Sequence, residues 1–129
     1  MQTRKVLLVF DGGSKGNPGL GYGSYAVKTG PQTTITRLEF GNGVTNNEAE
    51  YDTLITALEM LVDQEDTSQI TLEVRGDSQL VIFQVLGRWK ARNARMRVRR
   101  DRVRELLRHF RGFRLVLQPR EDSVRVLGH

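Results

Sequence analysis

The spacing of hydrophobic residues changes along this chain, and each spacing predicts a type of secondary structure. Residues 6–10 form an unbroken apolar run, which is typical of a strand buried on both faces. Residues 22–27 and 33–40 favour two further strands, and Gly30 and Pro31 between them predict a turn. We therefore expect the first three strands to form a meander.

A helix follows these strands and is expected to begin at about Asn47. Apolar residues then recur at helical spacing, namely Tyr51, Leu54, Ile55, Leu58, Leu61 and Val62. Residues 70–74 favour a strand, and Ser78 is a suitable N-cap for a short helix that runs toward Val85. A basic loop at 87–93 precedes a helix at 94–110 and a last strand at 113–117. This order of elements predicts an α/β fold.

The composition fits one domain that spans residues 1–129, because 38% of the residues are hydrophobic and can form a core. The chain has no cysteine and only two histidines, His109 and His129, which excludes disulfides and thiolate zinc sites. Carboxylate-bound Mg²⁺ or Mn²⁺ is the metal chemistry that remains. The apolar run near the N-terminus is too short for a signal peptide, and no stretch is long enough to span a bilayer. We expect a soluble cytoplasmic protein.

The net charge of +5 is distributed unevenly. Residues 88–114 hold twelve basic and two acidic side chains, whereas the rest of the chain holds eight basic and thirteen acidic ones. An acidic body joined to one basic segment suits a metal site beside a surface that binds phosphates. The alternative is a solvated helix face without a more specific role.

Three acidic residues stand in distinctive surroundings. Asp11 closes the first apolar run in DGGSKGNPG, Glu50 lies near the start of the predicted helix in TNNEAEY, and Asp77 follows a predicted strand in GDSQLV. Mg²⁺ takes oxygen ligands and retains waters and substrate phosphates, so carboxylates from separate elements suit phosphoryl transfer. For Asp77, the alternative is an acid favoured by the dipole of the following helix.

The helical spacing distinguishes two neighbouring glutamates. Glu48 shares a polar stripe with Asp52 and Glu59, which we expect to face solvent, whereas Glu50 lies at the edge of the face toward the core. Only Glu50 is expected to point toward Asp11 and Asp77. The alternative is a capping box with Asn47 as the N-cap and Glu50 three residues later.

The glycine-rich segment DGGSKGNPGLGYG is not a nucleotide-binding loop. It lacks the Lys-Ser or Lys-Thr ending of a P-loop, and after a predicted loop at 13–19 a strand follows rather than a helix. Its glycines would let backbone amides approach a sugar–phosphate chain, and the Asn17 amide can bond to a 2′-hydroxyl. Ordinary turn chemistry is the alternative.

From about residue 6 to about residue 119, these three motifs resemble ribonuclease H, type 1. The resemblance implies a ribonuclease H-like fold, with a mixed five-stranded sheet flanked by helices. It implies a metal-dependent endonuclease that cuts the RNA strand of RNA–DNA hybrids, leaving 5′-phosphate and 3′-hydroxyl ends. Two Mg²⁺ ions are implied, with Asp11 bridging both and Glu50 and Asp77 each holding one. We expect a monomer that needs no protein partner.

The resemblance also implies a substrate-binding set. The side chains expected to test for RNA are Asn17, Asn46, Asn47 and Gln79, and the other residues expected to contact substrate are Gly12, Gly13, Ser14, Trp89, Lys90 and Arg92. For the asparagines, helix capping is an alternative. Trp89 either lies in the core or stacks against a sugar of the DNA strand.

The C-terminal segment PREDSVRVLGH departs from the family pattern. Leu127 stands where relatives have a fourth aspartate, and the final helix is expected to be missing. Either Asp122 or Glu121 takes that place, or the site works with three acids, or the enzyme is weakened or inactive. His129 is a poor substitute for the loop histidine of many relatives. The alternatives to a hybrid nuclease are a non-catalytic hybrid-binding module and a DNA nuclease of the same superfamily.

Overall fold

The computed structural model describes residues 3–128, and a five-stranded mixed sheet lies at its centre. The strand order is β3-β2-β1-β4-β5; β1, β2 and β3 are antiparallel, whereas β4 runs parallel to both β1 and β5. The predicted meander and mixed sheet are confirmed. The strands are β1 (Arg4–Lys15), β2 (Gly19–Thr29), β3 (Gln32–Val44), β4 (Ile70–Gly76) and β5 (Gly112–Leu117).

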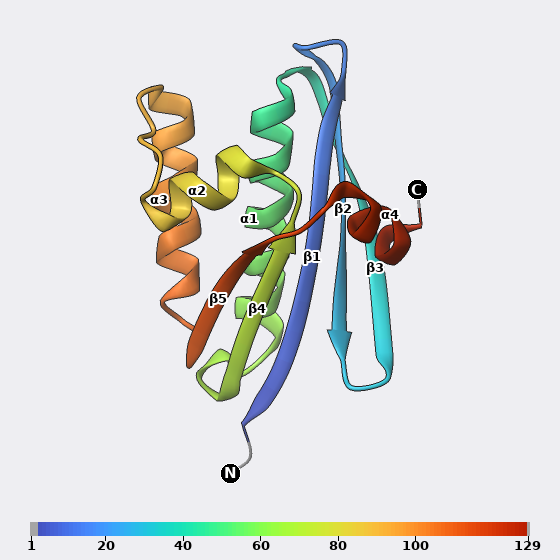
Figure 1. Ribbon diagram of the computed structural model, residues 1–129, viewed down its shortest axis with the longest axis vertical. Helices are drawn as coiled ribbons and strands as arrows, with labels where there is room; N and C mark the ends of the chain where they lie inside the picture. The colour runs from blue at the N-terminus through green and yellow to red at the C-terminus, as the bar shows by residue number, and fades with distance from the viewer. Residues whose placement is uncertain (1–2, 129) are drawn as a thin grey trace.

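Three helices cover one face of the sheet, and a fourth lies on the other face (Figure 1). The first three are α1 (Asn46–Gln64), α2 (Gln79–Leu86) and α3 (Ala94–Leu107), and the fourth is α4 (Arg120–Leu127). A short 3₁₀ turn (Thr67–Gln69) precedes β4. Within residues 3–128, no helix combines the length and the apolar character needed to cross a membrane.

The strand β1 contributes side chains to both layers of the molecule. Leu8 and Phe10 pack against the three helices, whereas Val9 packs on the opposite face with Ala26 and Leu127. This alternation follows from strand geometry, in which successive side chains point to opposite faces. It explains the unbroken apolar run in the sequence and places the end of β1 between the two layers.

The glycine-rich segment forms a hairpin, so the predicted loop at 13–19 is wrong. β1 continues to Lys15, and its residues pair with β2 from Asp11 opposite Ser24 to Lys15 opposite Leu20. Only residues 16–18 connect the two strands, and Gly16 has a φ of +85°, which favours glycine. Glycine is a weak strand former, but pairing with β2 supplies hydrogen bonds that override the local preference.

The final helix is present, contrary to the sequence prediction. α4 is eight residues long, has Glu121 and Asp122 in its first turn, and is followed by Gly128 in the left-handed conformation. Acidic residues in the first turn and a glycine after the last turn are favourable helix ends. Leu127 is fully buried, so packing against the sheet stabilises this short helix.

Candidate active site

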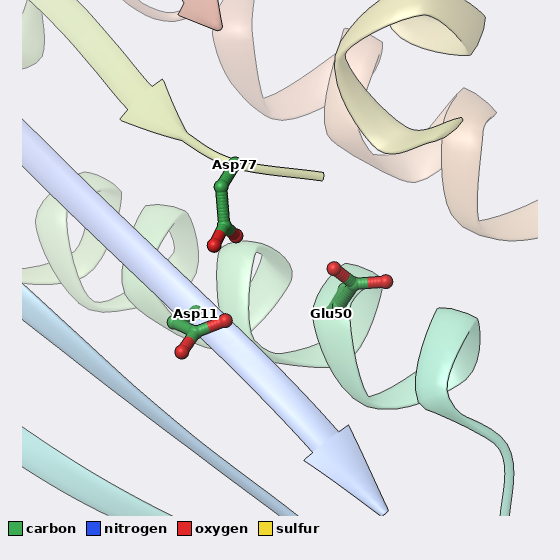
Figure 2. A group of neighbouring side chains, drawn as sticks. All are labelled: Asp11, Glu50 and Asp77. Carbon is green, nitrogen blue, oxygen red and sulfur yellow. The ribbon is translucent and has the colours of Figure 1, made fainter. Parts of the chain in front are cut away.

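Three carboxylates from separate elements meet at one end of the sheet. Asp11 lies on β1, Glu50 lies in the second turn of α1, and Asp77 directly follows β4 (Figure 2). One carboxylate oxygen from each residue lies within 4.8 Å of the others. The structure therefore brings together the three acids that the sequence selected, and the arrangement is a candidate metal centre.

Gly12 allows β1 and α1 to approach closely at this point. A Cβ atom at Gly12 would lie 2.6 Å from the carbonyl oxygen of Ala49, which is shorter than a real Cβ contact allows. The missing side chain at Gly12 thus lets Glu50, the next residue after Ala49, lie beside Asp11. Gly12 was predicted to contact a sugar–phosphate chain, whereas its contacts in the structure support a role in packing against α1.

The electrostatics of the cluster favour a bound cation. Asp11 is buried, and its Oδ1 accepts a hydrogen bond of 2.9 Å from the Gly12 backbone N–H. Burial raises the pKa of Glu50 from 4.5 to about 7, and the nearby Asp77 and Asp11 carboxylates add to the rise; Ser78 and Arg120 oppose it. A hard divalent cation would offset this repulsion, and three carboxylates are a suitable oxygen donor set for it.

An arginine from α4 faces the cluster. The Arg120 Nη1 atom lies 3.7 Å from Asp77 Oδ2, and the Arg120 side chain is largely exposed. Arg120 and Asp77 line an open pocket of about 580 Å³ together with Gln79, Leu117, Gln118 and Pro119. Asp77 therefore shares an open pocket with Gln79, which the sequence assigned to substrate binding.

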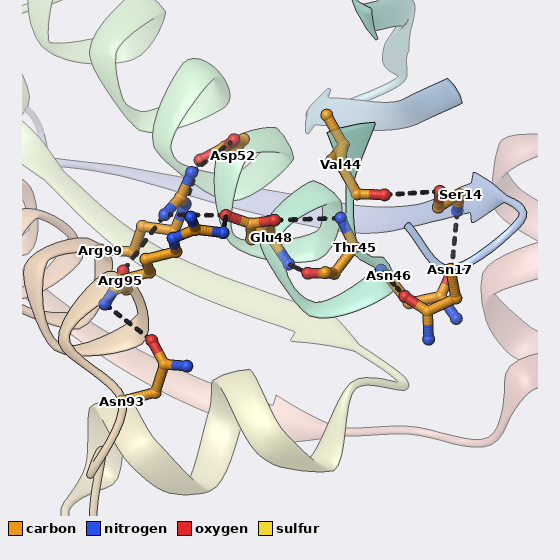
Figure 3. Close-up of polar contacts among 10 residues, drawn as sticks. All are labelled: Ser14, Asn17, Val44, Thr45, Asn46, Glu48, Asp52, Asn93, Arg95 and Arg99. Atoms are coloured by element: carbon orange, nitrogen blue, oxygen red, sulfur yellow. Dashed lines mark hydrogen bonds and ion pairs between the residues drawn. The ribbon is translucent and has the colours of Figure 1, made fainter. Parts of the chain in front are cut away.

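Asn46 and Asn17 join the start of α1 to the β1–β2 hairpin (Figure 3). The Ser14 backbone N–H donates to Asn46 Oδ1 at 2.8 Å, and the Asn46 N–H donates to Asn17 Oδ1 at 3.0 Å. The Ser14 hydroxyl donates to the Val44 carbonyl at 2.6 Å. Asn47 and Gln79 are exposed on nearby helix starts. Asn46 and Asn47 thus lie about one helical turn before Glu50 on α1, and Gln79 lies two residues after Asp77.

Comparisons with known proteins agree with this geometry. Residues 14–126 match the family described as reverse transcriptase-like. The chain is 38% identical to ribonuclease HI of Halobacterium salinarum over 124 residues, which is 94% of this chain and 60% of that protein. The crystal structure of RNase H1 from the same archaeon superposes with a TM-score of 0.85 at 37% identity, covering 95% of this chain and 91% of that one. The chain belongs to the ribonuclease H family.

A second solved ribonuclease H is LC11-RNase H1 in complex with an RNA/DNA hybrid. It has a TM-score of 0.84 and 28% identity, and the match covers 94% of this chain and 90% of that one. The predicted family and fold are therefore confirmed. The chain spans 60% of the length of the Halobacterium salinarum protein.

The alternative explanation of Glu50, a capping box with Asn47 as the N-cap, is wrong. The N-cap is Thr45 rather than Asn47, and the reciprocal partner is Glu48 rather than Glu50. Glu48 accepts the Thr45 N–H at 3.0 Å, which lowers the pKa of Glu48. Glu50 is therefore not needed for the capping box.

The predicted solvent-facing stripe on α1 is wrong at Glu48 and Asp52, because α3 packs against them, whereas Glu59 is exposed as predicted. Glu48 is buried, and its Oε2 lies 3.6 Å from Arg99 and 3.9 Å from Arg95 (Figure 3). Asp52 is half-buried and pairs with Arg99 at 2.8 Å. The periodicity of one helix cannot reveal arginines that a second helix brings to it.

The basic segment divides into two groups of side chains. One group bonds within the protein, and its members are Arg97, Arg99, Arg100, Arg102 and Arg104. The side chains of Lys90 and Arg92 are exposed, and within residues 3–128 neither contacts a carboxylate. The charge run thus contains both structural arginines and cations available to a ligand.

Trp89 is not a core residue, so that alternative is wrong. Its side chain is 45% exposed, and its ring packs edge-on against Phe83 with a centroid distance of 5.1 Å. The Arg88 guanidinium lies over the same Phe83 ring, 5.6 Å from the ring centroid. An exposed tryptophan beside Lys90 and Arg92 can stack against a flat or apolar part of a ligand.

A fourth acid does not join the metal centre in the described part of the chain. Among residues 3–128, the cluster comprises Asp11, Glu50 and Asp77. Asp122 instead pairs with Arg125 at 3.3 Å, and Glu121 is exposed. Leu127 is buried against Val9 and Ala26. His129, the residue compared with the family histidine, lies outside the described residues.

Proposed function

We propose that this protein is a metal-dependent endoribonuclease that hydrolyses the RNA strand of RNA–DNA hybrids. The observation that carries the proposal is the cluster of Asp11, Glu50 and Asp77 beside an asparagine-lined helix start. Family membership and the hybrid bound to LC11-RNase H1 support it. We further propose that it acts as a single domain and a monomer in the cytoplasm.

Asp11, Glu50 and Asp77 would hold two Mg²⁺ ions. When bound, such ions supply an activated water and stabilise the leaving 3′-oxygen, which gives 5′-phosphate and 3′-hydroxyl ends. The protein's part is to keep one oxygen of each of the three carboxylates within 4.8 Å of the others, and Asp77 also lines the adjacent pocket. Arg120, beside Asp77, is placed to approach the phosphate as well.

The asparagine contacts suit a test for RNA. Asn46 Oδ1 accepts the Ser14 N–H, and Asn17 Oδ1 accepts the Asn46 N–H, so both side-chain oxygens have a fixed role. Each side-chain NH₂ group then points outward as a donor. We propose that these donors, with Asn47 and Gln79, bind 2′-hydroxyls of the RNA strand, because that group distinguishes RNA from DNA.

The basic segment is proposed to hold the DNA strand. Lys90 and Arg92 are exposed and can neutralise phosphates, while the exposed Trp89 ring can stack on a sugar. These residues belong to the loop between α2 and α3. That loop ends at Asn93, which lies on the opposite side of the α1 N-terminus from Ser14 and Asn17 (Figure 3). A two-stranded substrate would therefore contact asparagines on one side and cations on the other.

A second candidate is a hybrid-binding module with weak or no turnover. Two observations favour it: Leu127, which the family resemblance aligns with a fourth aspartate, is buried, and the Arg120 guanidinium already lies near Asp77. With three carboxylates, the second cation would be held loosely. Activity would then be low in Mg²⁺ and partly recovered in Mn²⁺, which binds such sites more tightly.

The test is a cleavage assay on a labelled RNA–DNA hybrid with each metal. We expect Mg²⁺- or Mn²⁺-dependent cutting of the RNA strand, with 5′-phosphate products, and no cutting of duplex DNA. Asp11→Asn serves as the inactive control. Hybrid binding without cleavage in either metal would favour the binding module, and efficient cutting of duplex DNA would favour a DNA nuclease.

A further inference from the structure

Two ion-paired contacts join α1 to α3 at different distances from the acidic cluster. Close to the cluster, Arg99 pairs with Glu48 and Asp52. About three helical turns further along α1, Arg102 pairs with Glu59 at 2.8 Å. The second contact is exposed, whereas the first includes the buried Glu48 carboxylate.

The Glu48 carboxylate has partners on both of its oxygens. Oε1 accepts the Thr45 backbone N–H at 3.0 Å, and the Thr45 hydroxyl in turn accepts the Glu48 N–H at 3.1 Å. Oε2 faces the Arg99 and Arg95 guanidinium groups, and the Glu48 side chain is only 9% exposed. One buried carboxylate therefore fixes the start of α1 and also contacts α3.

The Thr45 side of this contact leads directly to the asparagines. Thr45 is followed by Asn46, which binds the Ser14 N–H and donates to Asn17. The position of the N-cap therefore determines where the two proposed 2′-hydroxyl donors lie. Figure 3 shows these contacts as one series from the hairpin to Glu48.

The arginine side leads to the beginning of α3. Arg99 is held by Asp52 through bonds of 2.8 and 3.3 Å, and its Nη1 donates to the Arg95 carbonyl at 3.2 Å. Asn93 caps the helix by accepting the Arg95 N–H at 2.8 Å. The first turn of α3, which follows the loop with Lys90 and Arg92, is thereby fixed to α1.

We propose that Glu48 is a positioning residue that sets the distance between the asparagine groove and the basic start of α3. The inference rests on the proposed function, since it assumes that one hybrid contacts both surfaces. A rigid spacing matters because a two-stranded ligand gains the second contact only when the two surfaces match its width. Without Glu48, each surface keeps its own groups, but their separation is no longer fixed.

The test compares Glu48→Gln with the matched variant Glu59→Gln, which weakens the other contact between the same helices. Glu48→Gln keeps the size of the side chain and removes its charge. We expect it to raise the KM for the hybrid roughly tenfold while kcat changes less than about threefold, because binding common to ground and transition states is lost. Glu59→Gln should change KM less than about twofold.

The direction of the change separates positioning from simple electrostatics. Removing a negative charge from a protein of net charge +5 should strengthen binding to a polyanion if only charge matters. The positioning role requires weaker binding instead. Unchanged or tighter binding of the hybrid by Glu48→Gln overturns the proposal.

Two further readouts keep the test decisive. In an Arg99→Gln background, the effect of Glu48→Gln on KM should fall below about twofold, because Glu48 acts through Arg99. Amide hydrogen exchange of Ser14 and Asn46, measured without substrate, should be faster in Glu48→Gln than in Glu59→Gln. Equal exchange in the two variants overturns the positioning proposal, even if the protein cuts no hybrid. Faster exchange in Glu48→Gln, in a protein that binds no hybrid, overturns only the proposed function.

Discussion

At the scale of single residues, the burial of carboxylates, together with their mutual repulsion, governs the electrostatics of the site. Asp11 is buried, and Glu50 has its pKa raised to about 7 because burial and two neighbouring carboxylates disfavour its charged form. Without a metal ion, the charged cluster therefore lowers the free energy of unfolding, and a bound cation would raise it again. This property can be measured without substrate.

The first prediction concerns pH and Glu50 in the metal-free protein. The pKa of Glu50 is about 7 when folded and 4.5 ordinarily, so the folded state binds the proton more tightly. Protonation of Glu50 therefore stabilises the folded state. This stabilisation is complete below pH 4.5 and is lost as the pH rises through about 7. Glu50→Gln, which has no charge, should then be more stable than wild type at pH 8 by about 1–3 kcal/mol, since a tenfold difference in proton affinity is worth about 1.4 kcal/mol.

Urea denaturation in EDTA at pH 4.5 and pH 8 measures this difference. The advantage of Glu50→Gln should be absent at the lower pH. Adding Mg²⁺ at pH 8 should stabilise wild type more than the variant. An equal difference at both pH values would show that Glu50 does not titrate as described.

The second prediction concerns the other two acids. Asp11→Asn and Asp77→Asn keep the side-chain shape but bind divalent cations weakly, so each should lower hybrid cleavage by about two orders of magnitude or more. Circular dichroism should stay unchanged. Ser68→Ala, far from the site on the 3₁₀ turn, is the control and should retain wild-type cleavage. A well-folded Asp77→Asn protein with most of its activity would contradict the metal-centre assignment.

The three acids could be predicted from sequence because each stands beside a strong local signal. Asp11 follows the apolar run within β1, Asp77 directly follows β4, and Glu50 lies at the edge of the amphipathic face of α1. Glu48 could not be assigned, because its partners Arg95 and Arg99 reach it through tertiary packing. A Thr-x-x-Glu spacing at Thr45 and Glu48 was the available signal for the capping box.

At the scale of elements, α4 shows how a short helix depends on packing. Eight residues are too few for an isolated helix in water, so burial of Leu127 against Val9 and Ala26 supplies most of its stability. The sequence prediction failed here because comparison with the family pattern emphasised the absent aspartate. Gly128 and the acids of the first turn were the signals of a helix in this segment.

The third prediction follows from the burial of Leu127. Leu127→Asp would restore the family's residue type, yet it would place a carboxylate in an apolar cluster. We expect a loss of about 3–5 kcal/mol, or detachment of α4 with faster exchange of the Gly128 amide, which donates to Val124. Leu127→Met, which nearly conserves volume, should cost less than about 1.5 kcal/mol. Higher Mg²⁺-supported activity in Leu127→Asp would contradict this account.

The fourth prediction separates the two groups of basic side chains. Lys90→Ala with Arg92→Ala should reduce the slope of log affinity for the hybrid against log salt by about one per lost phosphate contact, with an unchanged melting temperature. Arg104→Ala should instead lower the stability of the fold, because Arg104 donates to the Val85 and Gln84 carbonyls at the end of α2. Removing those bonds should cost about 1–3 kcal/mol and leave the slope unchanged. If Arg104→Ala reduced the salt slope as much as the double variant does, the basic residues would act through their summed charge rather than as two separate groups.

At the scale of the whole molecule, the sheet order brings distant parts of the sequence together. β1 lies at the centre, with β2 next to it in the chain and β4 reaching it only after α1. The fold class was predictable because hydrophobic spacing and the order of elements favour this layered arrangement. The pairing that places Asp77 near Asp11 came only from family resemblance, since no local signal encodes which strands are neighbours.

That topology has a kinetic consequence for the metal centre. Asp11 belongs to a local hairpin that can form early, whereas Asp77 takes its place only when β4 pairs with β1 across a long loop, which costs closure entropy. We therefore expect the complete centre to form after the rate-limiting step of folding. Interactions absent from the transition state slow unfolding without accelerating folding.

The fifth prediction is that millimolar Mg²⁺ slows unfolding of wild type several-fold and leaves the refolding rate within about twofold. Stopped-flow measurements across a urea series, with and without the ion, provide both rates. Asp11→Asn, which lacks the central ligand, should show neither effect. If Mg²⁺ instead accelerated refolding, the three carboxylates would already be close together in the transition state, and the acidic cluster would be part of the folding nucleus.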